Sequence, residues 1–436
     1  MRRLSALLSP AAMTQPLSNV RDPRGWSALI VAIFSVLLFI RLGTPSRFYF
    51  DEIHYIPAAR VLLQFDHISN REHPLVGKEF LALAITWFGD RPLSWRIFPA
   101  LGGILTLVAF IRLMWFTTLS RFSTLAGGVL LATGFVLFVQ ARIAMLDIFM
   151  VCFAMTGLWL VASAVRLPKQ ARWRLALGGI AMGLALGSKW NAAPIVVLPG
   201  LVFLVLRVKE AKARFLTRRD CGPIPGISLI EAGIWLGLLP AVVYLATFWP
   251  VFFYAKNPLT IGGYWEYHQK MYELQQQTVK PHPYMSRWYD WVIDWRPIWY
   301  LYERVDGAQR GVLLLGNPFT MIAGLFAVVW CGFASLFQGN RPALVFFGLY
   351  AATIGMWIVA PKPIQFYYHY FLPSCFLLGA LAVALENLWH AGWHKLALGS
   401  VVLSVVMFAI FYPILSAAHL AGPYSFEHWM WLNSWR

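Results

Sequence analysis

Residues 95–117 read WRIFPALGGILTLVAFIRLMWFT, an apolar run that contains only two arginines and no acid. A helix of that length crosses a hydrocarbon core of about 30 Å. Similar runs recur outward from it in both directions, so the sequence predicts an all-α polytopic membrane protein in one domain, residues 1–436. We expect about eleven membrane-spanning helices, at 26–42, 95–117, 122–140, 143–164, 172–188, 191–207, 228–249, 313–336, 342–360, 366–385 and 396–417. A twelfth, short segment at 79–89 is the main alternative to that number.

The composition supports a membrane protein and explains the charge. The chain is 59% hydrophobic and 13% charged, whereas soluble domains carry about a quarter charged residues. A net charge of +17 would suggest nucleic acid in a soluble protein. Here the basic residues cluster in short gaps between apolar runs, at 165–174 and 208–227, which is typical of cytoplasmic loops.

The positions of these basic gaps predict the orientation of the chain. With the N-terminus inside, both gaps face the cytoplasm and the C-terminus lies outside. Residues 1–25 are then a cytoplasmic tail that includes Arg2 and Arg3 rather than a cleaved signal peptide. We expect a multi-pass protein of the plasma (inner) membrane.

Two long segments, 43–94 and 250–312, face outward in this arrangement. Four acids lie inside and Glu231 lies in a span, and the other 14 of the 19 acids lie on or near the outer face. Acid–base chemistry is therefore expected there. The second segment is dense in Trp and Tyr, which suits helices at the lipid–water boundary.

The first outer segment opens with the sequence FYFDEIHY at residues 48–55. Adjacent residues of a helix point about 100° apart, so Asp51 and Glu52 cannot both address one atom. A helical Asp51 shares a face with His54 and Tyr55. This pattern favours one carboxylate as a base and the other as an organiser, with a plain helix cap at Asp51 as the alternative.

The same segment continues as REHPLVGK at residues 71–78. Proline and glycine break the helix there and bring His73, an acid and Lys78 close together at the membrane edge. Lys78 is a candidate to meet a phosphate. An interpretation of the same weight is that the Lys78 side chain extends to the lipid headgroups.

Asp147 lies within an apolar run, where a carboxylate is costly and indicates a functional site. Arg142 is five residues away, the wrong spacing for a same-face pair. Lys189 is expected at the same depth, and a purely structural Asp147–Lys189 pair is the alternative to a functional one. Arg96 and Arg41 fall on the predicted outer boundary, where interfacial anchoring would also explain them.

Further polar motifs follow at HPYMSRW, residues 282–288, at RPIWY, residues 296–300, and at FYYHY, residues 366–370. His54, His73, His282 and His369 all lie outside, yet their spacing matches no ligand motif, so no metal site is predicted. Four cysteines show no pairing pattern. Three of them lie in apolar runs, where we expect them buried as small hydrophobic residues.

Taken in order, these motifs resemble the protein O-mannosyltransferase family, multispanning glycosyltransferases of the GT-C class. The family pattern has an Arg that ends the first span (Arg41), Phe-Asp-Glu-x-His (from Phe50), His-Pro-Pro-Leu-Gly-Lys (from His73) and Arg96. It continues with the stretches at Ala141–Asp147, Ser188–Trp190 and His282–Trp288, with Arg296–Tyr300, Gly316–Pro318 and Tyr368–Tyr370. The resemblance covers residues 40 to 380. Val76 is a minor departure, and the segment 250–312 is too short for the β-trefoil insertion that many members carry, which leaves the acceptor open.

The resemblance implies an inverting transfer of mannose from a polyprenyl-phosphate donor to Ser or Thr of a translocated protein. Asp51 would be the base, because inversion needs only one, and Glu52 would organise the site. The donor phosphate and sugar would meet a set of mainly charged side chains: Arg96, Arg142, Lys189, Lys78, His73, Asp147, Arg41 and His369. The acceptor or lipid would meet a second set: His54, Tyr55, His282, Tyr284 and Arg296. No further cofactor is expected, nucleic acid is not a partner, and the acceptor would be met at the translocon.

Two other readings remain open at this point. A transferase of the same fold could glycosylate lipid A or another envelope glycan. A transporter or scaffold would place polar groups near the midplane in repeated halves, whereas this chain gathers them at one face without repeats.

Overall fold

The computed structural model describes residues 21–211, 214–277 and 282–436. The predicted tail up to residue 20, Lys212 and Pro281 lie outside these ranges. The helices before the second outer segment are α2 (Arg24–Phe39), α3 (Glu52–Gln64), α4 (Val76–Phe88), α5 (Pro92–Thr118), α6 (Arg121–Ala132), α7 (Val136–Gln140), α8 (Leu146–Arg166), α9 (Ala171–Ser188), α10 (Ala193–Ala211), α11 (Leu229–Gly233) and α12 (Leu239–Ala246). The later elements are α13 (Tyr264–Gln275), α14 (Trp288–Val292), β1 (Ile298–Val305), β2 (Ala308–Leu314), α15 (Pro318–Phe333), α16 (Arg341–Val359), α17 (Phe371–His390) and α18 (His394–Leu415).

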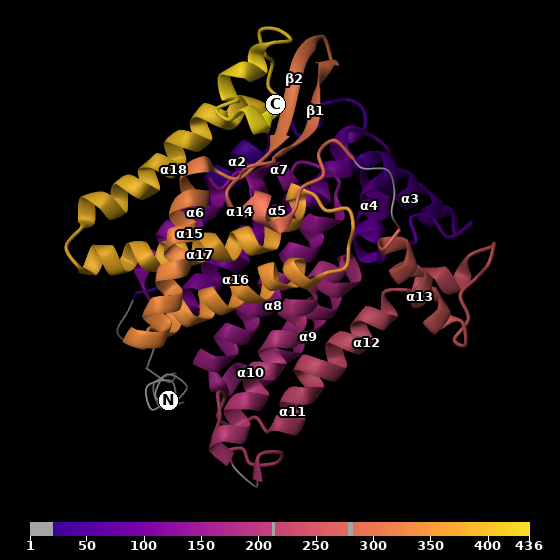
Figure 1. Cartoon of the computed structure of the whole chain (residues 1–436). Helices are drawn as coiled ribbons and strands as arrows, with labels where there is room; N and C mark the ends of the chain where they lie inside the picture. The colour runs from indigo at the N-terminus through magenta and orange to yellow at the C-terminus, as the bar shows by residue number, and fades with distance from the viewer. Residues whose placement is uncertain (1–20, 212–213, 278–281) are drawn as a thin grey trace.

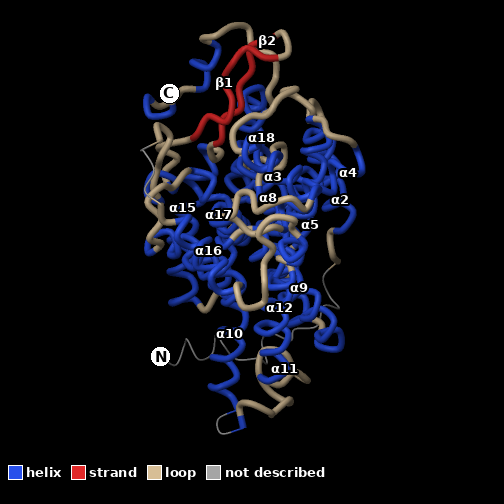
Figure 2. Tube along the Cα trace, turned by 90° about the vertical axis from the view of Figure 1, so that its right-hand side faces the viewer, coloured by secondary structure: helices blue, strands red, loops and turns tan. Residues whose placement is uncertain are grey.

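The molecule is a bundle of helices that is broad in the view of Figure 1 and narrow after the 90° turn of Figure 2. Helices α3 and α4 and the hairpin β1–β2 lie at one end, and the loop between α10 and α11 lies at the other. Eight helical segments of the described chain are long and apolar enough to cross a membrane. A polytopic helical membrane protein is therefore confirmed.

Three of the eleven predicted spans do not meet that criterion. The run 26–42 forms a helix of only 16 residues, α2. The run 122–140 is broken into α6 and α7 around Phe135, which has a φ of 68°. The run 172–188 forms α9, whose first turn carries Arg172 and Arg174. The alternative span at 79–89 is α4, which with 13 residues is about 20 Å long and too short to cross.

Small residues let the central helices approach closely, as is common between membrane helices. A Cβ added to Gly183 of α9 would lie 2.6 Å from the Cβ of Val243 and 2.7 Å from the carbonyl oxygen of Pro240, both in α12. A Cβ added to Gly103 of α5 would lie 2.3 Å from the Cβ of Ala141. Side-chain volume at these positions therefore sets the distance between the helices.

The second outer segment contains a feature that the sequence analysis did not predict, an antiparallel hairpin of β1 and β2. The residues 313–317, assigned above to a span, belong to the end of β2 and to the turn that follows, and α15 begins only at Pro318. Trp265 on α13 is exposed, in keeping with an interfacial helix. Cys152, Cys331 and Cys375 are buried as predicted.

Candidate active site

Asp51 and Glu52 lie at the start of α3 and have different surroundings. Asp51 precedes the helix, but its side chain makes no capping hydrogen bond, so the cap alternative has no support in the geometry. Its side chain is partly exposed, whereas Glu52 is fully buried. The two neighbouring acids are therefore not equivalent.

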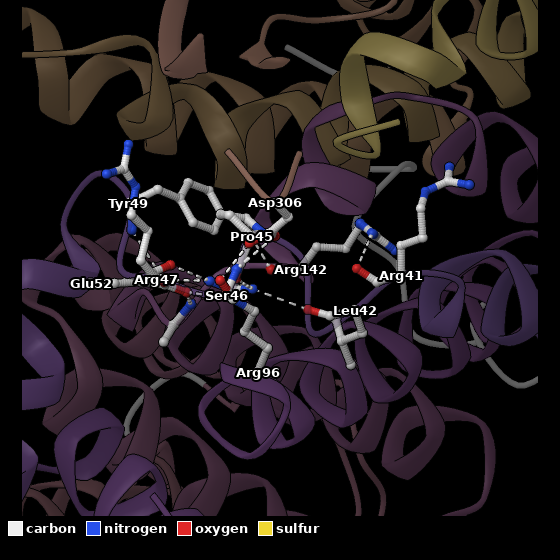
Figure 3. Close-up of polar contacts among 11 residues, drawn as sticks. Arg41, Leu42, Pro45, Ser46, Arg47, Tyr49, Glu52, Arg96, Arg142 and Asp306 are labelled. Carbon is white, nitrogen blue, oxygen red and sulfur yellow. Dashed lines mark hydrogen bonds and ion pairs between the residues drawn. The ribbon is translucent and has the colours of Figure 1, made fainter. Parts of the chain in front are cut away.

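Glu52 is the centre of a closed network with Arg96 from α5 (Figure 3). Its carboxylate accepts hydrogen bonds from Arg96 Nε at 2.8 Å and from an Arg96 terminal nitrogen at 2.9 Å. It also accepts the backbone N–H groups of Ala144 at 3.0 Å and Tyr49 at 3.3 Å. Glu52 thereby joins the loop before α3 to α5 and to the loop before α8.

The placement of Arg96 corrects its expected role at the donor phosphate. Besides Glu52, its guanidinium donates to the carbonyl oxygens of Leu42 (3.2 Å), Pro45 (2.9 Å) and Arg47 (3.1 Å). These five hydrogen bonds use the full donor capacity of an arginine. Arg96 is fully buried, so it shapes the loop 42–47 and has no N–H left for a phosphate.

Arg142 and Arg41 bind groups at the ends of helices. Arg142 donates to the carbonyl oxygens of Leu38, Arg41 and Ser416, which join the end of α2 to the end of α18. Arg41 is exposed and donates to the Ser416 hydroxyl at 2.9 Å. The contacts of Arg142 therefore serve to hold these helix ends together rather than to bind a phosphate.

Lys78 is also committed to the protein. Its ammonium donates to the carbonyl oxygens of Asn70 at 2.7 Å and His73 at 2.8 Å, and the side chain is buried. Burial lowers the pKa of Lys78 to about 7, against the raising effect of Glu72 and Glu79. The buried side chain does not extend to the lipid headgroups, and two of its three N–H donors fix the loop that carries His73.

Asp51 instead lies within the electrostatic influence of Asp147 and Lys189. Lys189 donates to both carboxylate oxygens of Asp147, at 2.9 and 2.7 Å, and its ammonium lies 4.8 Å from the ring centre of Tyr368. Burial raises the pKa of Asp51 to about 6, with Lys189 and His54 lowering it and Asp147 raising it. The Asp147–Lys189 pair is thus real, and it acts electrostatically on the candidate base.

Aromatic rings surround the same position. Phe50 stacks on Tyr300 of β1 at 4.1 Å between ring centres and lies 6.0 Å from Tyr368. Burial raises the pKa of Tyr300 well above its ordinary value, and the charges of Asp147 and Asp51 raise it further. The hairpin therefore contributes a side chain to the surroundings of Asp51.

A cavity of about 140 Å³ lies beside these residues, lined by His73, Lys189, Trp190, Gln275, Trp357 and Lys362 among others. Lys362 donates to the Gln275 side-chain oxygen at 2.8 Å. Burial, together with the charge of Lys189, lowers the pKa of Lys362 to about 8. Two lysines on one small cavity are suited to bind an anion.

Lys362 was not among the predicted site residues. Its signal was a lone lysine between two prolines, Pro361 and Pro363, just before the tenth predicted span. Gln275 and Tyr300 were missed as well, because their place in the site depends on contacts with residues that are distant in the sequence.

The predicted histidines fall in different places. His73 lies in the cavity, 6.0 Å from Tyr55 between ring centres, and burial lowers its pKa well below the ordinary value, so it is neutral there. His54 is exposed, although its charge still acts on Asp51. His369 is buried against Trp357 and Tyr368, and its Nε2 has no hydrogen-bond partner among the described residues.

The residues predicted to meet the acceptor or lipid from the second long loop, His282, Tyr284 and Arg296, instead make contacts that hold this loop in place. The His282 ring contacts Phe366 and Tyr284, at 5.2 and 5.8 Å between ring centres. Arg296 donates to the carbonyl oxygens of Pro283 at 2.7 Å and Ser434 at 3.3 Å. Arg296 therefore ties this loop to the C-terminal residues. Within the ranges that the structure describes, no group of three or more His, Cys, Asp or Glu side chains could hold a metal ion.

The whole architecture matches solved membrane glycosyltransferases. It superposes on a chain of the S. cerevisiae protein O-mannosyltransferase Pmt1–Pmt2 complex bound to the sugar donor with a TM-score of 0.84, over 100% of this chain and 94% of that one, at 13% identity. ArnT from Cupriavidus metallidurans bound to undecaprenyl phosphate gives a TM-score of 0.57 over 88% of this chain and 64% of that one, at 17% identity. The fold is that of a GT-C glycosyltransferase.

Sequence comparison narrows this class. The model of dolichyl-phosphate-mannose-protein mannosyltransferases matches residues 86–254, and that of the C-terminal four-helix region of protein O-mannosyltransferases matches residues 260–344. The polyprenol-phosphate-mannose–protein mannosyltransferase of Mycolicibacterium smegmatis is 27% identical over 100% of this chain and 98% of its own length. That of Mycobacterium tuberculosis is 28% identical over 98% and 95%. The chain belongs to the protein O-mannosyltransferase family, which makes it an enzyme and not a transporter or scaffold.

Proposed function

We propose that the protein transfers mannose from a polyprenyl-phosphate donor to Ser or Thr hydroxyls of proteins at the non-cytoplasmic face of the membrane. The observation that carries this proposal is the position of Asp51 beside the Asp147–Lys189 pair and the cavity of His73, Lys189 and Lys362. The full-length relatives named above act on such a donor, which supports the same substrate here.

Asp51 is the base in this proposal. It accepts the proton of the acceptor hydroxyl while the hydroxyl oxygen forms a bond to the anomeric carbon. The bond from that carbon to the phosphate oxygen breaks, and the carrier phosphate leaves with the electron pair. A pKa of about 6 for Asp51 keeps the carboxylate ionised at neutral pH yet more basic than an ordinary aspartate, as suits a general base.

Lys189 and Lys362 receive the leaving phosphate. Charge develops on the phosphate as the bond breaks, and cations in a partly dry site stabilise it strongly. The Lys189 ammonium is held by Asp147 on one side and by the Tyr368 ring on the other, so it needs little reorganisation. The carrier tail remains in lipid.

The orientation, the domain and the partners follow the same proposal. The basic gaps 165–174 and 208–227 face the cytoplasm, so Asp51 faces outward. The chain acts as a single domain, supported by one hydrophobic core that includes residues from Phe34 to Trp435. The partners are the donor lipid and a translocated protein, met at the translocon.

The test compares exported proteins from a deletion strain complemented with the parent chain or with the Asp51→Asn variant. The parent is expected to restore hexose on Ser and Thr in peptide mass spectra, and the variant is expected to restore none at equal membrane abundance. Full activity of the variant would remove Asp51 as the base. A change confined to lipid A or to a glycan would show that the acceptor is not protein.

A further inference from the structure

A second, larger cavity of about 620 Å³ lies between α2, α5, α8 and α9. Its charged residues are Asp22, Arg24, Arg112 and Arg174. Arg112 is 16 residues beyond Arg96 on α5, which places it about 24 Å farther along the helix axis. The cavity therefore lies near the membrane boundary opposite Asp51 and is separate from the active site.

The lining carries an excess of positive charge. Asp22 accepts from Arg112 at 2.8 Å and from Arg24 at 3.0 Å. Burial alone would raise the pKa of Asp22, but these two arginines lower it below its ordinary value. Arg174 is held by Ser163 at 2.8 Å and by Gln170. Three arginines and one carboxylate thus line the cavity.

Apolar and aromatic side chains form the remaining wall, including Trp115, Phe116 and Trp159. The Phe116 ring lies between Arg112 and Arg174, at 5.0 and 6.0 Å from their guanidinium carbons. Trp159 Nε1 is buried and has no hydrogen-bond partner among the described residues. A buried N–H donor without a partner indicates an acceptor that the protein itself does not supply.

We propose that this cavity binds the headgroup of an acidic phospholipid. The volume of this cavity falls within the range of about 300–1,000 Å³ that is typical of small-molecule sites. A volume of this size is far larger than an isolated ion needs. A phosphodiester supplies the negative charge for Arg112 and Arg174 and an acceptor for Trp159 Nε1. The glycerol and the acyl chains lie against the aromatic wall, and basic cavities between membrane helices commonly hold such lipids.

The test measures lipid retention by the full chain in nanodiscs that contain equal amounts of phosphatidylglycerol and phosphatidylcholine. After detergent extraction, native mass spectrometry counts the lipids that remain bound. The parent protein is expected to retain phosphatidylglycerol in preference, and the Arg112→Gln/Arg174→Gln variant is expected to lose about tenfold or more of that retention. The assay does not depend on orientation or on transferase activity, since both leaflets contain the lipid.

Two further variants keep the result unambiguous. Arg172→Gln/Arg218→Gln removes two arginines that pair with Glu231 and Asp220 outside the cavity, and it is expected to retain lipid as the parent does. Asp22→Asn removes the competing carboxylate and is expected to raise retention, a gain that misfolding cannot produce. The proposal would be overturned if the parent retained the two lipids equally or if the Arg112/Arg174 variant lost no retention. It would also be overturned if Asp22→Asn gave no gain, or if millimolar glycerol phosphate alone displaced the lipid.

Discussion

The adjacent carboxylates of Asp51 and Glu52 differ in role, because the oxygens of Glu52 are already occupied by hydrogen bonds and those of Asp51 can accept a substrate proton. Glu52 accepts hydrogen bonds from Arg96, Ala144 and Tyr49, so it has no lone pair suited to receive a substrate proton. Asp51, one residue away, keeps partial exposure and faces the charges of Lys189 and Asp147. The chemistry of the site is therefore expected to respond to Asp51, and its folding to Glu52.

The pKa of Asp51 predicts the pH below which the transferase activity decreases. Because burial raises this pKa to about 6, the carboxylate becomes protonated below that pH and can no longer accept the hydroxyl proton. We expect kcat/KM to fall about tenfold for each pH unit below 6 and to be level above it. Initial rates with a purified donor and a Ser/Thr peptide between pH 4.5 and 8 would measure this, and a limb near pH 4 would contradict it.

Lys362 is expected to act on transfer from the donor. Substituting Lys362→Met removes a charge-assisted contact worth about 1.5–3 kcal/mol, so kcat/KM for the donor should fall by about tenfold to a hundredfold. The matched control is Lys256→Met, which removes an exposed lysine paired with Asp66 and should leave kcat/KM unchanged. An unchanged kcat/KM in the Lys362 variant would exclude this lysine from the phosphate site.

Glu52 is expected to affect stability first. The change Glu52→Gln leaves Arg96 as a buried charge without a counter-ion, and breaking a buried pair costs about 3–5 kcal/mol. We expect a lower Tm and less folded protein in the membrane, measured by fluorescence size-exclusion chromatography after heating. Asp51→Asn serves as the control, since it lies outside this network and should keep the parent Tm.

The sequence pointed to candidate residues more readily than to their contacts. It placed Asp147 and Lys189 at one depth, and the structure pairs them. Arg96, Arg142 and Lys78 were expected at the phosphate, yet each donates to backbone carbonyl groups, which for Lys78 belong to the loop just before its own helix. A side chain's charge is visible in the sequence, whereas the carbonyl groups that consume its donors become known only from the fold.

At the scale of elements, apolar length predicted the long helices well and the interruptions poorly. The break between α6 and α7 lies inside a run that hydrophobicity treats as uniform, whereas the hairpin β1–β2 lies almost wholly in the segment 250–312, for which interfacial helices were expected. The hairpin did carry a local signal, Asp306-Gly307, since both residues adopt positive φ in the two-residue turn that such strands prefer. This turn signal was not recognised, because the apolar residues at the end of β2 continue directly into the apolar run of the following span.

The contact between α9 and α12 depends on a missing side chain at Gly183. The variant Gly183→Val would force its side chain into Val243 and the Pro240 carbonyl group, and overpacking of this kind costs about 1–3 kcal/mol. We expect a lower Tm and reduced activity, because α9 ends at the residue before Lys189. Gly399→Val on α18 meets open space and is the control; equal behaviour of the two variants would contradict the prediction.

At the scale of the whole molecule, the C-terminal residues bind the second outer segment. Trp435 is buried, its Nε1 donates to the Asp294 carbonyl oxygen at 2.7 Å, and its own carbonyl oxygen accepts from Trp299 at 3.3 Å. Arg296 adds its bond to Ser434. These contacts connect the end of the chain to β1, which carries Tyr300 toward Asp51.

Removal of the Trp435 side chain should therefore loosen the hairpin at a distance from the active site. Truncation of a buried tryptophan costs about 3–5 kcal/mol, so Trp435→Ala is expected to lower the Tm and to speed proteolysis of the segment 282–314. Limited proteolysis in nanodiscs, read by mass spectrometry, measures this. The exposed Trp393→Ala should show the parent cleavage pattern, and protection equal to the parent in Trp435→Ala would refute the link.

The closed network of Glu52 and Arg96 also has an evolutionary consequence. A lineage that loses either side chain first passes through an intermediate with a stranded buried charge or with several orphaned carbonyl groups. Selection against that intermediate should make the two positions covary and be inherited as a unit. Lys362 lies outside this network, and we expect its position to vary where the donor changes.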